Sequence, residues 1–459
     1  MTDHILIQSL KFSYNKQQAI LNIPELSIPL HQLSLLHGRS GSGKSTLLKI
    51  IAGLLPKYGG QLTGNVSIPH QQSVAMMFQD PGMQFALDTP RHEIEFALEN
   101  LQTPAKTIPS IVDQTLHDVG ITHLADRHFT TLSGGEQQRA TLAVIIAMQR
   151  QIILLDEPFA SLDYHNRDLI LQKLVALVRE GKTVIIADHD LSAYTELSPN
   201  IIEFGQTVHC LTNQETQALL ETATHQPSLT TPIPEPDQPN AVILENYILQ
   251  RNATTLINQT ALQIVKNKTT LLTGESGSGK SSFFKSLINL VPSAGTIKLC
   301  QQSAEQRHRQ QRGKSIGLVF QNANDQFLKV TVQEELELSL KNGRNPFFTN
   351  HRLQLVLNHL GLNHLTNQVV YTLSGGQKKK LQLLVMLMMG QPLLLLDEPF
   401  SGLDYHSITN VVDLMQRSLA VYPQTLVIIS HQIAALTPLI DYHLHLAHHR
   451  LQYQEGTTK

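Results

Sequence analysis

A glycine-rich motif of eight residues occurs twice in this 459-residue chain and constrains its fold more than any other feature. Residues 38–45 read GRSGSGKS and residues 274–281 read GESGSGKS, each after an apolar run and before a helix-like stretch. The glycines let the backbone wrap closely around an anion, and the N–H groups at the start of the helix would bind it. One copy could be an ordinary glycine-rich turn. Two copies in this context indicate phosphate-binding loops, so the sequence predicts that nucleoside triphosphate binds twice.

Each loop supplies a lysine for the β- and γ-phosphates and a serine hydroxyl for Mg²⁺. These residues are Lys44 and Ser45 in the first half, and Lys280 and Ser281 in the second. The full set expected to contact ATP at the two loops is Gly38, Arg39, Ser40, Gly41, Ser42, Gly43, Lys44, Ser45, Thr46, Gly274, Glu275, Ser276, Gly277, Ser278, Gly279, Lys280, Ser281 and Ser282.

Other motifs are repeated as well. TLSGGEQQR at residues 131–139 returns 241 residues later as TLSGGQKKK, and ILLDEPFASLD at residues 153–163 returns at the same spacing as LLLDEPFSGLD. The two glycine-rich loops are 236 residues apart. Spacings that differ by a few residues indicate a duplicated domain with loop insertions rather than a periodic array. We therefore predict domains at residues 1–222 and 241–459, with a linker at residues 223–240.

The linker region is rich in proline. Residues 226–240 read QPSLTTPIPEPDQPN, which favours an extended, semi-rigid spacer. A proline-rich recognition motif for a partner is the alternative.

Composition excludes several classes of protein. The formal net charge is −2, which gives no electrostatic footprint for nucleic acid. With only Cys210 and Cys300, neither a disulfide framework nor a cysteine zinc cluster is available. The longest apolar stretches are shorter than the roughly 20 residues that span a bilayer, and the N-terminus does not resemble a secretory signal. We expect a soluble protein in a reducing compartment.

Each half alternates strands with helices, which predicts a mostly parallel sheet covered on both faces. The apolar runs at residues 152–155 and 393–396 are too continuous for a one-sided antiparallel sheet. Helices are predicted at residues 91–101, 108–119, 333–340 and 351–360, and a further helix begins at each LSGG segment.

With these motifs in the same order twice, the chain resembles the ATP-binding-cassette (ABC) ATPases, with two α/β cassettes fused in one chain and packed head to tail. The resemblance implies that each cassette has a helical subdomain and that the protein hydrolyses ATP. It also implies roles for paired residues: Mg²⁺ binding by the Walker B aspartates, general-base catalysis by the next glutamates, and contact with the γ-phosphate by the switch histidines. These residues are, in the same order, Asp156 and Asp397, Glu157 and Glu398, and His189 and His431. The loop glutamines Gln79 and Gln321 would sense both Mg²⁺ and the γ-phosphate.

The resemblance also implies that each ATP lies between the phosphate loop of one cassette and the LSGG segment of the other. The donors expected in these segments are Ser133, Gly134, Gly135, Ser374, Gly375 and Gly376. Asp163 and Asp404 would lie on the loop that bridges the sites. Tyr14 matches the aromatic that stacks on adenine, whereas the aligned residue in the second half is Gln250.

Within the family, two kinds of function compete: the motor of a transporter with separate membrane subunits, and a soluble ATPase that acts on nucleic acid or the ribosome. The short linker, the separation of only 53 positions between Gln79 and Leu132 and the near-neutral charge favour the transporter. FQDPGMQF at residues 78–85, FQNANDQF at residues 320–327 and HEIEFALENL at residues 92–101 resemble segments of energy-coupling-factor (ECF) and cobalt-type importers.

This resemblance implies a peripheral protein on the cytoplasmic face of the membrane, which binds integral membrane transport subunits beside residues 79–85 and 321–327 and binds no nucleic acid. Departures from the usual pattern are Gly82, Met83, Ala323 and Asn324, where acidic residues or proline are usual. The motor of an exporter or of another importer class is the alternative.

Four histidines near the C-terminus, His443, His445, His448 and His449, could be read as a metal-binding tract. Because YHLHLAH alternates polar and apolar residues, we predict instead a half-buried strand with histidines on its exposed face.

Overall fold

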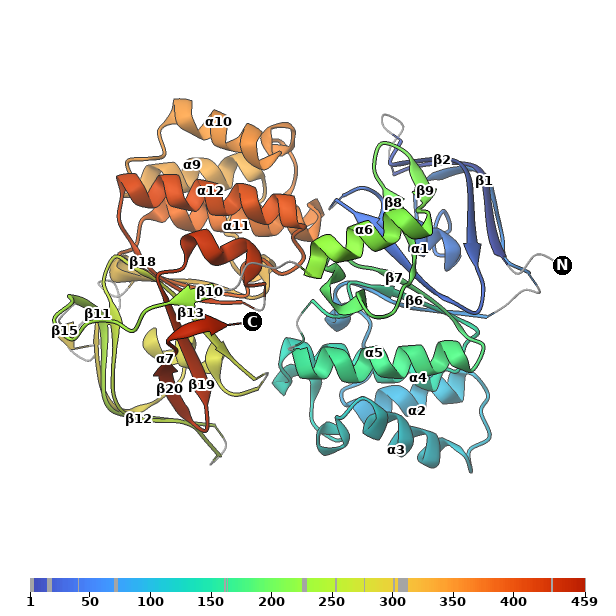
Figure 1. The fold of residues 1–459 in the computed structure, drawn as a ribbon, viewed down its shortest axis with the longest axis horizontal. Coiled ribbons are helices and arrows are strands. Elements are labelled where there is room, and N and C mark those ends of the chain that lie inside the picture. The colour runs from blue at the N-terminus through green and yellow to red at the C-terminus, as the bar shows by residue number, and fades with distance from the viewer. Residues whose placement is uncertain are drawn as a thin grey trace. The chain divides into compact units, whose positions relative to one another are not determined.

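The computed structural model describes residues 4–14, 19–39, 41–69, 73–160, 162, 164–224, 229–251, 254–275, 277–299, 302–303, 313–430 and 432–458. The chain separates into two compact units, which we call unit 1 (Met1–Gln226) and unit 2 (Pro227–Lys459). Each unit contains one copy of the repeated motifs (Figure 1).

Unit 1 contains two sheets. A six-stranded sheet has the order β5-β6-β7-β3-β8-β9, in which only β9 is antiparallel to its neighbour. A smaller antiparallel sheet has the order β2-β1-β4. The strands are β1 (His4–Ser13), β2 (Leu21–Pro29), β3 (Leu33–Gly38), β4 (Gln61–Ser67), β5 (Val74–Met77), β6 (Ile152–Asp156), β7 (Thr183–Ala187), β8 (Asn200–Phe204) and β9 (Val208–Cys210).

The helices of unit 1 are α1 (Lys44–Ile51), α2 (Pro90–Asn100), α3 (Ile108–Asp118), α4 (Gly134–Ala147), α5 (Tyr164–Arg179) and α6 (Asn213–Thr224). α2, α3 and α4 pack against one another and form the helical part of the unit (Figure 1). The central strands β6 and β7 are buried along their whole length, because helices and the smaller sheet cover both faces. The predicted α/β architecture with a mostly parallel core is confirmed.

Unit 2 repeats this arrangement. Its larger sheet has the order β16-β17-β18-β13-β19-β20, with only β20 antiparallel, and its antiparallel sheet has the order β12-β11-β14-β15. The strands are β11 (Asn240–Arg251), β12 (Thr254–Val265), β13 (Thr269–Gly274), β14 (Ala294–Leu299), β15 (Gln302–Ser303), β16 (Ile316–Val319), β17 (Leu393–Asp397), β18 (Thr425–Ile429), β19 (Tyr442–Ala447) and β20 (Arg450–Tyr453). The helices are α7 (Lys280–Leu287), α9 (Val332–Asn342), α10 (Asn350–Leu360), α11 (Gly375–Met389) and α12 (Tyr405–Val421).

Unit 2 also has a two-stranded sheet that the sequence did not lead us to expect. β10 (Leu229–Thr231) lies in the proline-rich region and pairs antiparallel with β21 (Gly456–Thr458). Leu229 is buried, and the Thr231 hydroxyl donates to the Gln454 carbonyl at 3.2 Å. This short stretch has two β-branched threonines and no proline, so it can pair although prolines follow it.

The prediction that the C-terminal histidines lie on the exposed face of a strand is wrong for His443. The predicted strand exists as β19, but His443 is only 2% exposed rather than on an open face. β19 lies between β13 and β20 and is covered on both sides. The Thr273 hydroxyl lies 2.7 Å from His443 Nε2 and 2.9 Å from His445 Nδ1. Burial, and to a smaller extent His445, lowers the pKa of His443 to about 4.

Within the described ranges, no helix is long and apolar enough to cross a membrane.

Candidate active sites

The predicted catalytic segments of each unit meet at the carboxyl ends of three adjacent parallel strands. In unit 1, β3 leads into the phosphate loop, β6 ends at Asp156 and β7 ends just before Asp188. The Glu157 N–H donates to the Ala187 carbonyl at 2.9 Å, and the Asp188 N–H donates to the Leu36 carbonyl at 3.2 Å. These backbone bonds fix the acidic turn and the switch segment beside the loop.

The phosphate loops need glycine at their tight points. Gly38 has φ 146°, and a Cβ there would lie 2.5 Å from the Phe204 carbonyl oxygen. Gly43 has φ 101°, and a Cβ would lie 2.4 Å from the Leu21 side chain. Gly274 is equally restricted, because a Cβ there would lie 2.6 Å from the Leu446 carbonyl oxygen. Both loops therefore follow a path that other residues would block.

The loop lysines fold back across their own loops. Lys44 Nζ donates to the carbonyls of Gly38 at 2.7 Å and Arg39 at 2.9 Å. Lys280 Nζ makes the matching bonds to Gly274 at 2.7 Å and Glu275 at 2.8 Å. Both lysines are mostly buried, so their ammonium groups are held close to the loop, where an anion would neutralise them.

A serine and an aspartate form the candidate Mg²⁺ position in each unit. Ser45 Oγ donates to Asp156 Oδ1 at 2.9 Å, and Ser281 Oγ donates to Asp397 Oδ1 at 3.1 Å. Burial, followed by the charge of Glu157, raises the pKa of Asp156 to about 6, while the Ser45 hydrogen bond opposes the shift. A cation would stabilise such a buried carboxylate.

These oxygen ligands fit Mg²⁺, which binds few protein groups and keeps water and phosphate oxygens in its shell. Across the described part of the chain, no group of three or more His, Cys, Asp or Glu side chains could hold a metal by itself. The ion would therefore depend on oxygens of the nucleotide and of water.

The predicted general bases occupy strained turns. Glu157 and Glu398 have φ of 50° and 46°, which is uncommon for residues other than glycine. In unit 1, Gln79 Nε2 donates to Glu157 Oε2 at 3.0 Å, which joins the loop glutamine to the predicted base.

The fifth residues of α4 and α11 support these bases differently. Gln138 Nε2 donates to the Glu157 carbonyl at 2.9 Å. The aligned residue in unit 2 is Lys379, whose Nζ donates to the carbonyls of Gln321 at 2.6 Å and Glu398 at 3.2 Å. Burial lowers the pKa of Lys379 to about 8, although the charges of Glu398 and Asp397 oppose the shift.

The LSGG segments begin the same two helices. Ser133 caps α4 and Ser374 caps α11, each in a capping box with the residue three positions later. The glycines that follow leave backbone N–H groups at the helix start, which is suited to an anion. Ser374 and Gly375 are exposed, so these groups are accessible in unit 2.

The two units differ at the predicted adenine position. Tyr14 is 44% exposed, and its hydroxyl lies 3.4 Å from Thr46 Oγ1. In unit 2 the matching bulge lies at Asn246 instead of Ser9, so the residue at the position of Tyr14 is Arg251 and not the predicted Gln250. The nearby Tyr247 is buried and its hydroxyl lies 2.5 Å from Ser286 Oγ, so its ring cannot stack on a nucleotide.

Several predicted residues lie outside the described residues: Ser40, Ser276, His431 and Asp163. Asp404 is described, and its Oδ1 accepts the Ser407 N–H at 2.7 Å as the cap of α12. The nucleotide roles of all these residues stay predictions.

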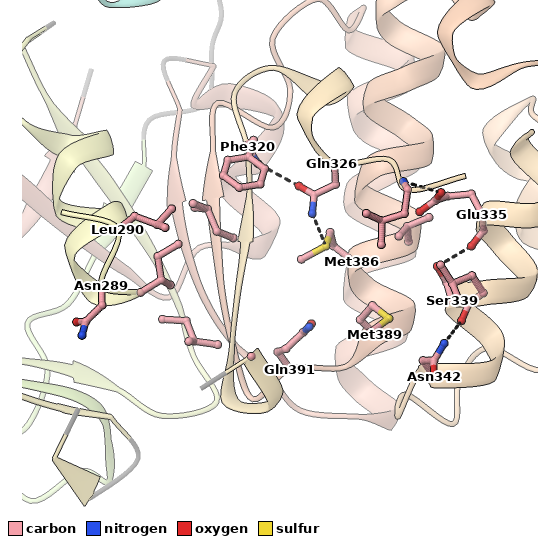
Figure 2. A pocket seen from close by; sticks show the side chains of 17 residues that line it. Asn289, Leu290, Phe320, Gln326, Glu335, Ser339, Asn342, Met386, Met389 and Gln391 are labelled. Atoms are coloured by element: carbon pink, nitrogen blue, oxygen red, sulfur yellow. Dashed lines mark hydrogen bonds between the residues drawn. The ribbon is translucent and has the colours of Figure 1, made fainter. Parts of the chain in front are cut away.

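Each unit has a groove beside its glutamine loop. The groove of unit 2 has a volume of about 820 Å³ and lies between β16, α9 and α11. Figure 2 shows Gln326 between Phe320 and Met386, with Glu335, Ser339 and Asn342 along α9. The groove of unit 1 has about 270 Å³ and is lined by the corresponding Phe78, Gln84 and Glu93.

Sequence reasoning missed a pair of buried glutamates that shape these grooves. Glu93 Oε2 accepts the N–H groups of Ala86 and Leu87 at 3.0 and 2.7 Å. Glu335 Oε2 accepts those of Leu328 and Lys329 at the same two distances. A glutamate at the same aligned position in both halves was the signal that could have identified them.

Comparisons with known proteins agree with this geometry. A sequence model described as "ABC transporter" matches residues 21–160 and 257–401. A putative ABC transporter ATP-binding protein of Treponema denticola is 30% identical over 94% of this chain and 92% of its own. A putative HMP/thiamine import ATP-binding protein, YkoD, of Bacillus subtilis is 28% identical over 90% of this chain and 84% of its own.

Solved structures show the same fold. In a crystal structure of archaeal ribosomal stalk protein aP1 with the archaeal ribosome recycling factor aABCE1, the matching chain has a TM-score of 0.65 and 19% identity, over 95% of this chain and 87% of that one. A structure titled RNase-L Inhibitor gives a TM-score of 0.62 at 17% identity, over 98% and 90% of the two chains.

Proposed function

The chain belongs to the ABC transporter family and is a tandem ATPase, and from that premise we propose that it is the motor subunit of an ECF-type importer. ATP binding and hydrolysis in the two units would drive solute uptake through separate integral membrane subunits. The observation that carries the proposal is that each unit has a groove directly beside the glutamine loop, and that this loop reaches the predicted general base in unit 1.

The proposed hydrolysis uses the same groups in each unit. Lys44 and Lys280 bind the phosphates, and Mg²⁺ is held by Ser45 with Asp156 and by Ser281 with Asp397. Glu157 and Glu398 polarise the attacking water. A positioned general base contributes about 10²–10⁴-fold to a rate, so two intact glutamates favour two active sites.

We propose that each ATP is completed by the LSGG segment of the other unit. The exposed helix start at Gly375 offers a backbone N–H donor to a nucleotide, whereas the Ser374 N–H donates to Gln377 Oε1 within the capping box. In this arrangement ATP holds the cassettes together, and hydrolysis releases them.

The grooves are the proposed docking sites for helices of the membrane subunits. The rim of the groove in unit 2 is apolar, because Leu290 and Leu328 are exposed at 58% and 81%. In unit 1 the exposed large apolar residue of the glutamine loop is Met83. Asp325 is an exposed acidic group at the position that Met83 occupies in unit 1, so a basic helix that contacts this position would depend more on the groove of unit 2.

Import, rather than export, is favoured by two observations. The FQ segments at residues 78–85 and 320–327 resemble those of ECF and cobalt-type importers. The name of the Bacillus subtilis relative also describes an import protein. Docking of this kind would hold the chain at the cytoplasmic face of the membrane.

The test is affinity purification of the chain from detergent-solubilised membranes of cells that also produce its membrane subunits. Leu328→Asp places a charge on the rim of the groove, whereas Leu355→Asp changes a residue on α10 that is 57% exposed and does not line the groove. We expect integral membrane proteins to co-purify with the parent and with Leu355→Asp, and to be lost with Leu328→Asp.

Asp325→Ala tests the charged contact. It should weaken the complex by roughly 1.5–3 kcal/mol if the contact is desolvated, while basal ATPase activity survives. Recovery of ribosomal components in place of membrane proteins, or normal assembly after changes in both grooves, would contradict the proposed function.

A further inference from the structure

We propose that Asp188, Tyr194 and Arg167 form a buried polar cluster that positions the switch histidine of unit 1 for catalysis. The inference rests on the proposed function, because it assumes that His189 contacts the γ-phosphate. Asp188, Tyr194 and Arg167 are positioning residues that act through His189 in unit 1.

The carboxylate of Asp188 accepts hydrogen bonds from the backbone at and just after the histidine. Its Oδ1 accepts the N–H groups of His189 at 2.7 Å and Asp190 at 3.0 Å. Its Oδ2 accepts the hydroxyl of Tyr194 at 2.8 Å. Asp188 is 4% exposed and Tyr194 is fully buried, so these bonds are shielded from water. Each buried bond therefore restricts the path of the backbone at residue 189.

Arg167 holds the other end of the same turn from α5. Its Nη1 donates to Asp190 Oδ2 at 2.6 Å, and its Nη2 lies 3.3 Å from Ser192 Oγ. Asp190 Oδ1 accepts the Ser192 N–H at 2.9 Å. Burial alone would raise the pKa of Asp190, but the charge of Arg167 lowers it overall, so the pair stays ionised.

The cluster also contacts the segment that carries the predicted base. Phe159 follows Glu157 by two residues, and its ring centroid lies 5.8 Å from the Arg167 guanidinium carbon and 6.3 Å from the ring centroid of Tyr194. The Glu157 N–H also donates to the carbonyl of Ala187, so a backbone hydrogen bond joins the segment that carries the base to the segment that carries the histidine. A displacement of one segment would therefore displace the other.

Unit 2 shows that the fold does not require this cluster. The residues aligned with Asp188, Arg167 and Tyr194 are Ser430, Ile408 and Leu436. Ile408 and Leu436 are buried in the apolar core with Phe400, which corresponds to Phe159. Buried ion pairs cost desolvation energy and can often be replaced by apolar residues without loss of stability. The buried charges of Asp188, Arg167 and Asp190 in unit 1 are therefore better explained by a role in positioning His189 than by a role in stabilising the fold.

The first experiment uses Glu398→Gln as the parent, in which hydrolysis reports on unit 1. Tyr194→Phe keeps the buried ring and removes only the donor to Asp188. We expect kcat to fall about five- to tenfold with KM unchanged, as one lost buried hydrogen bond would give. Asp188→Asn should lower kcat further.

Tyr247→Phe is the matched control. Tyr247 is equally buried and its hydroxyl is also hydrogen-bonded, but it lies in unit 2 on β11. It should lower the thermal unfolding midpoint about as much as Tyr194→Phe does, with kcat unchanged. An equal loss of kcat in the control, or an unchanged kcat in both Tyr194→Phe and Asp188→Asn, would overturn the inference.

The second experiment separates positioning from general destabilisation. In a His189→Ala background, Tyr194→Phe should have no additional effect on single-turnover hydrolysis, because the histidine that it positions is absent. A further loss by the same factor would show that the cluster does not act through His189 and would overturn the inference. If His189→Ala itself hydrolyses ATP at the parent rate, the proposed role of His189 fails instead.

Discussion

Units 1 and 2 build the same predicted catalytic geometry on different supporting residues. The lysine, serine and aspartate contacts at the two phosphate loops agree to within a few tenths of an ångström. Behind them, Lys379 replaces Gln138, and an apolar core replaces the Asp188 cluster. The side chain behind the predicted base can therefore change its chemical type as long as it supplies a donor to the same carbonyl, whereas Arg167 and Tyr194 are replaced by the apolar Ile408 and Leu436.

The strands beside the loops differ in the same way. In unit 1, His37 Nδ1 lies 3.1 Å from Glu203 Oε2. In unit 2 the aligned pair is Thr273 and His445, and the buried His443 joins it. Unit 1 therefore pairs a histidine with a carboxylate where unit 2 binds two histidines to a hydroxyl, and burial lowers the pKa of both histidines in unit 2.

The largest expected effect tests whether the two units are equivalent in catalysis. Glu157→Gln and Glu398→Gln should each slow hydrolysis in the altered unit by about 10²–10⁴-fold, because the predicted base is lost. Single-turnover measurements on each variant would resolve the remaining site. If one variant kept wild-type turnover while the other lost all activity, the units would not be equivalent.

The next effect concerns the buried lysine of unit 2. Lys379→Met should destabilise the protein by roughly 3–5 kcal/mol, because the carbonyls of Gln321 and Glu398 lose this donor and buried carboxylates lose a nearby positive charge. Lys379→Gln should cost much less, since Gln138 performs the same task in unit 1.

Denaturant unfolding measures both changes. The exposed Lys341, on the neighbouring helix α9, is the control, and Lys341→Met should change stability by less than about 0.5 kcal/mol. Equal costs for Lys379→Met and Lys379→Gln would show that the bonds to the carbonyls do not matter.

Acid should destabilise unit 2 through His443. Its pKa falls from the ordinary 6.5 to about 4 on folding, so the unfolded chain binds the proton more tightly. Stability is therefore complete above about pH 6.5 and declines as the pH drops toward 4, by up to about 3 kcal/mol.

His443→Gln should flatten this part of the curve of unfolding midpoint against pH. His448→Asn, at an exposed turn position with positive φ, should leave the curve unchanged. The same acid sensitivity in both variants would remove His443 as its source.

The smallest effect concerns adenine. Tyr14→Ala should weaken nucleotide binding in unit 1 by less than about tenfold, the range of an aromatic contact of 0.5–1.5 kcal/mol. Unit 2, with Arg251 in place of an aromatic residue, should already bind more weakly. Calorimetric titration of two variants, each able to bind ATP in one unit only, would test this difference. Equal affinities in the two variants would contradict it.

Local patterns made much of this predictable. The phosphate loops, the acidic turns after β6 and β17 and the capped helices α4 and α11 each depend on a few adjacent residues, and the duplication presents every pattern twice. The parallel core follows from the continuous apolar runs at its strands.

The remaining features depend on contacts between distant segments. β10 forms because residues 229–231 meet the C-terminal strand β21. His443 is buried because its face of β19 is covered, and the Thr273 hydroxyl of β13 lies 2.7 Å from its Nε2. Arg167 and Asp190 are 23 residues apart and meet only through the packing of α5 against the segment after β7.

The central claim is that one chain carries a complete pair of ATP sites. The Glu157→Gln/Glu398→Gln variant, incubated with Mg²⁺ and ATP, should trap nucleotide without hydrolysis. Tethering keeps the two units at an effective concentration in the millimolar range, which favours closure within one chain. Native mass spectrometry should then show a single chain with two ATP molecules. An ATP-induced dimer of chains, or one ATP per chain at saturation, would contradict the account.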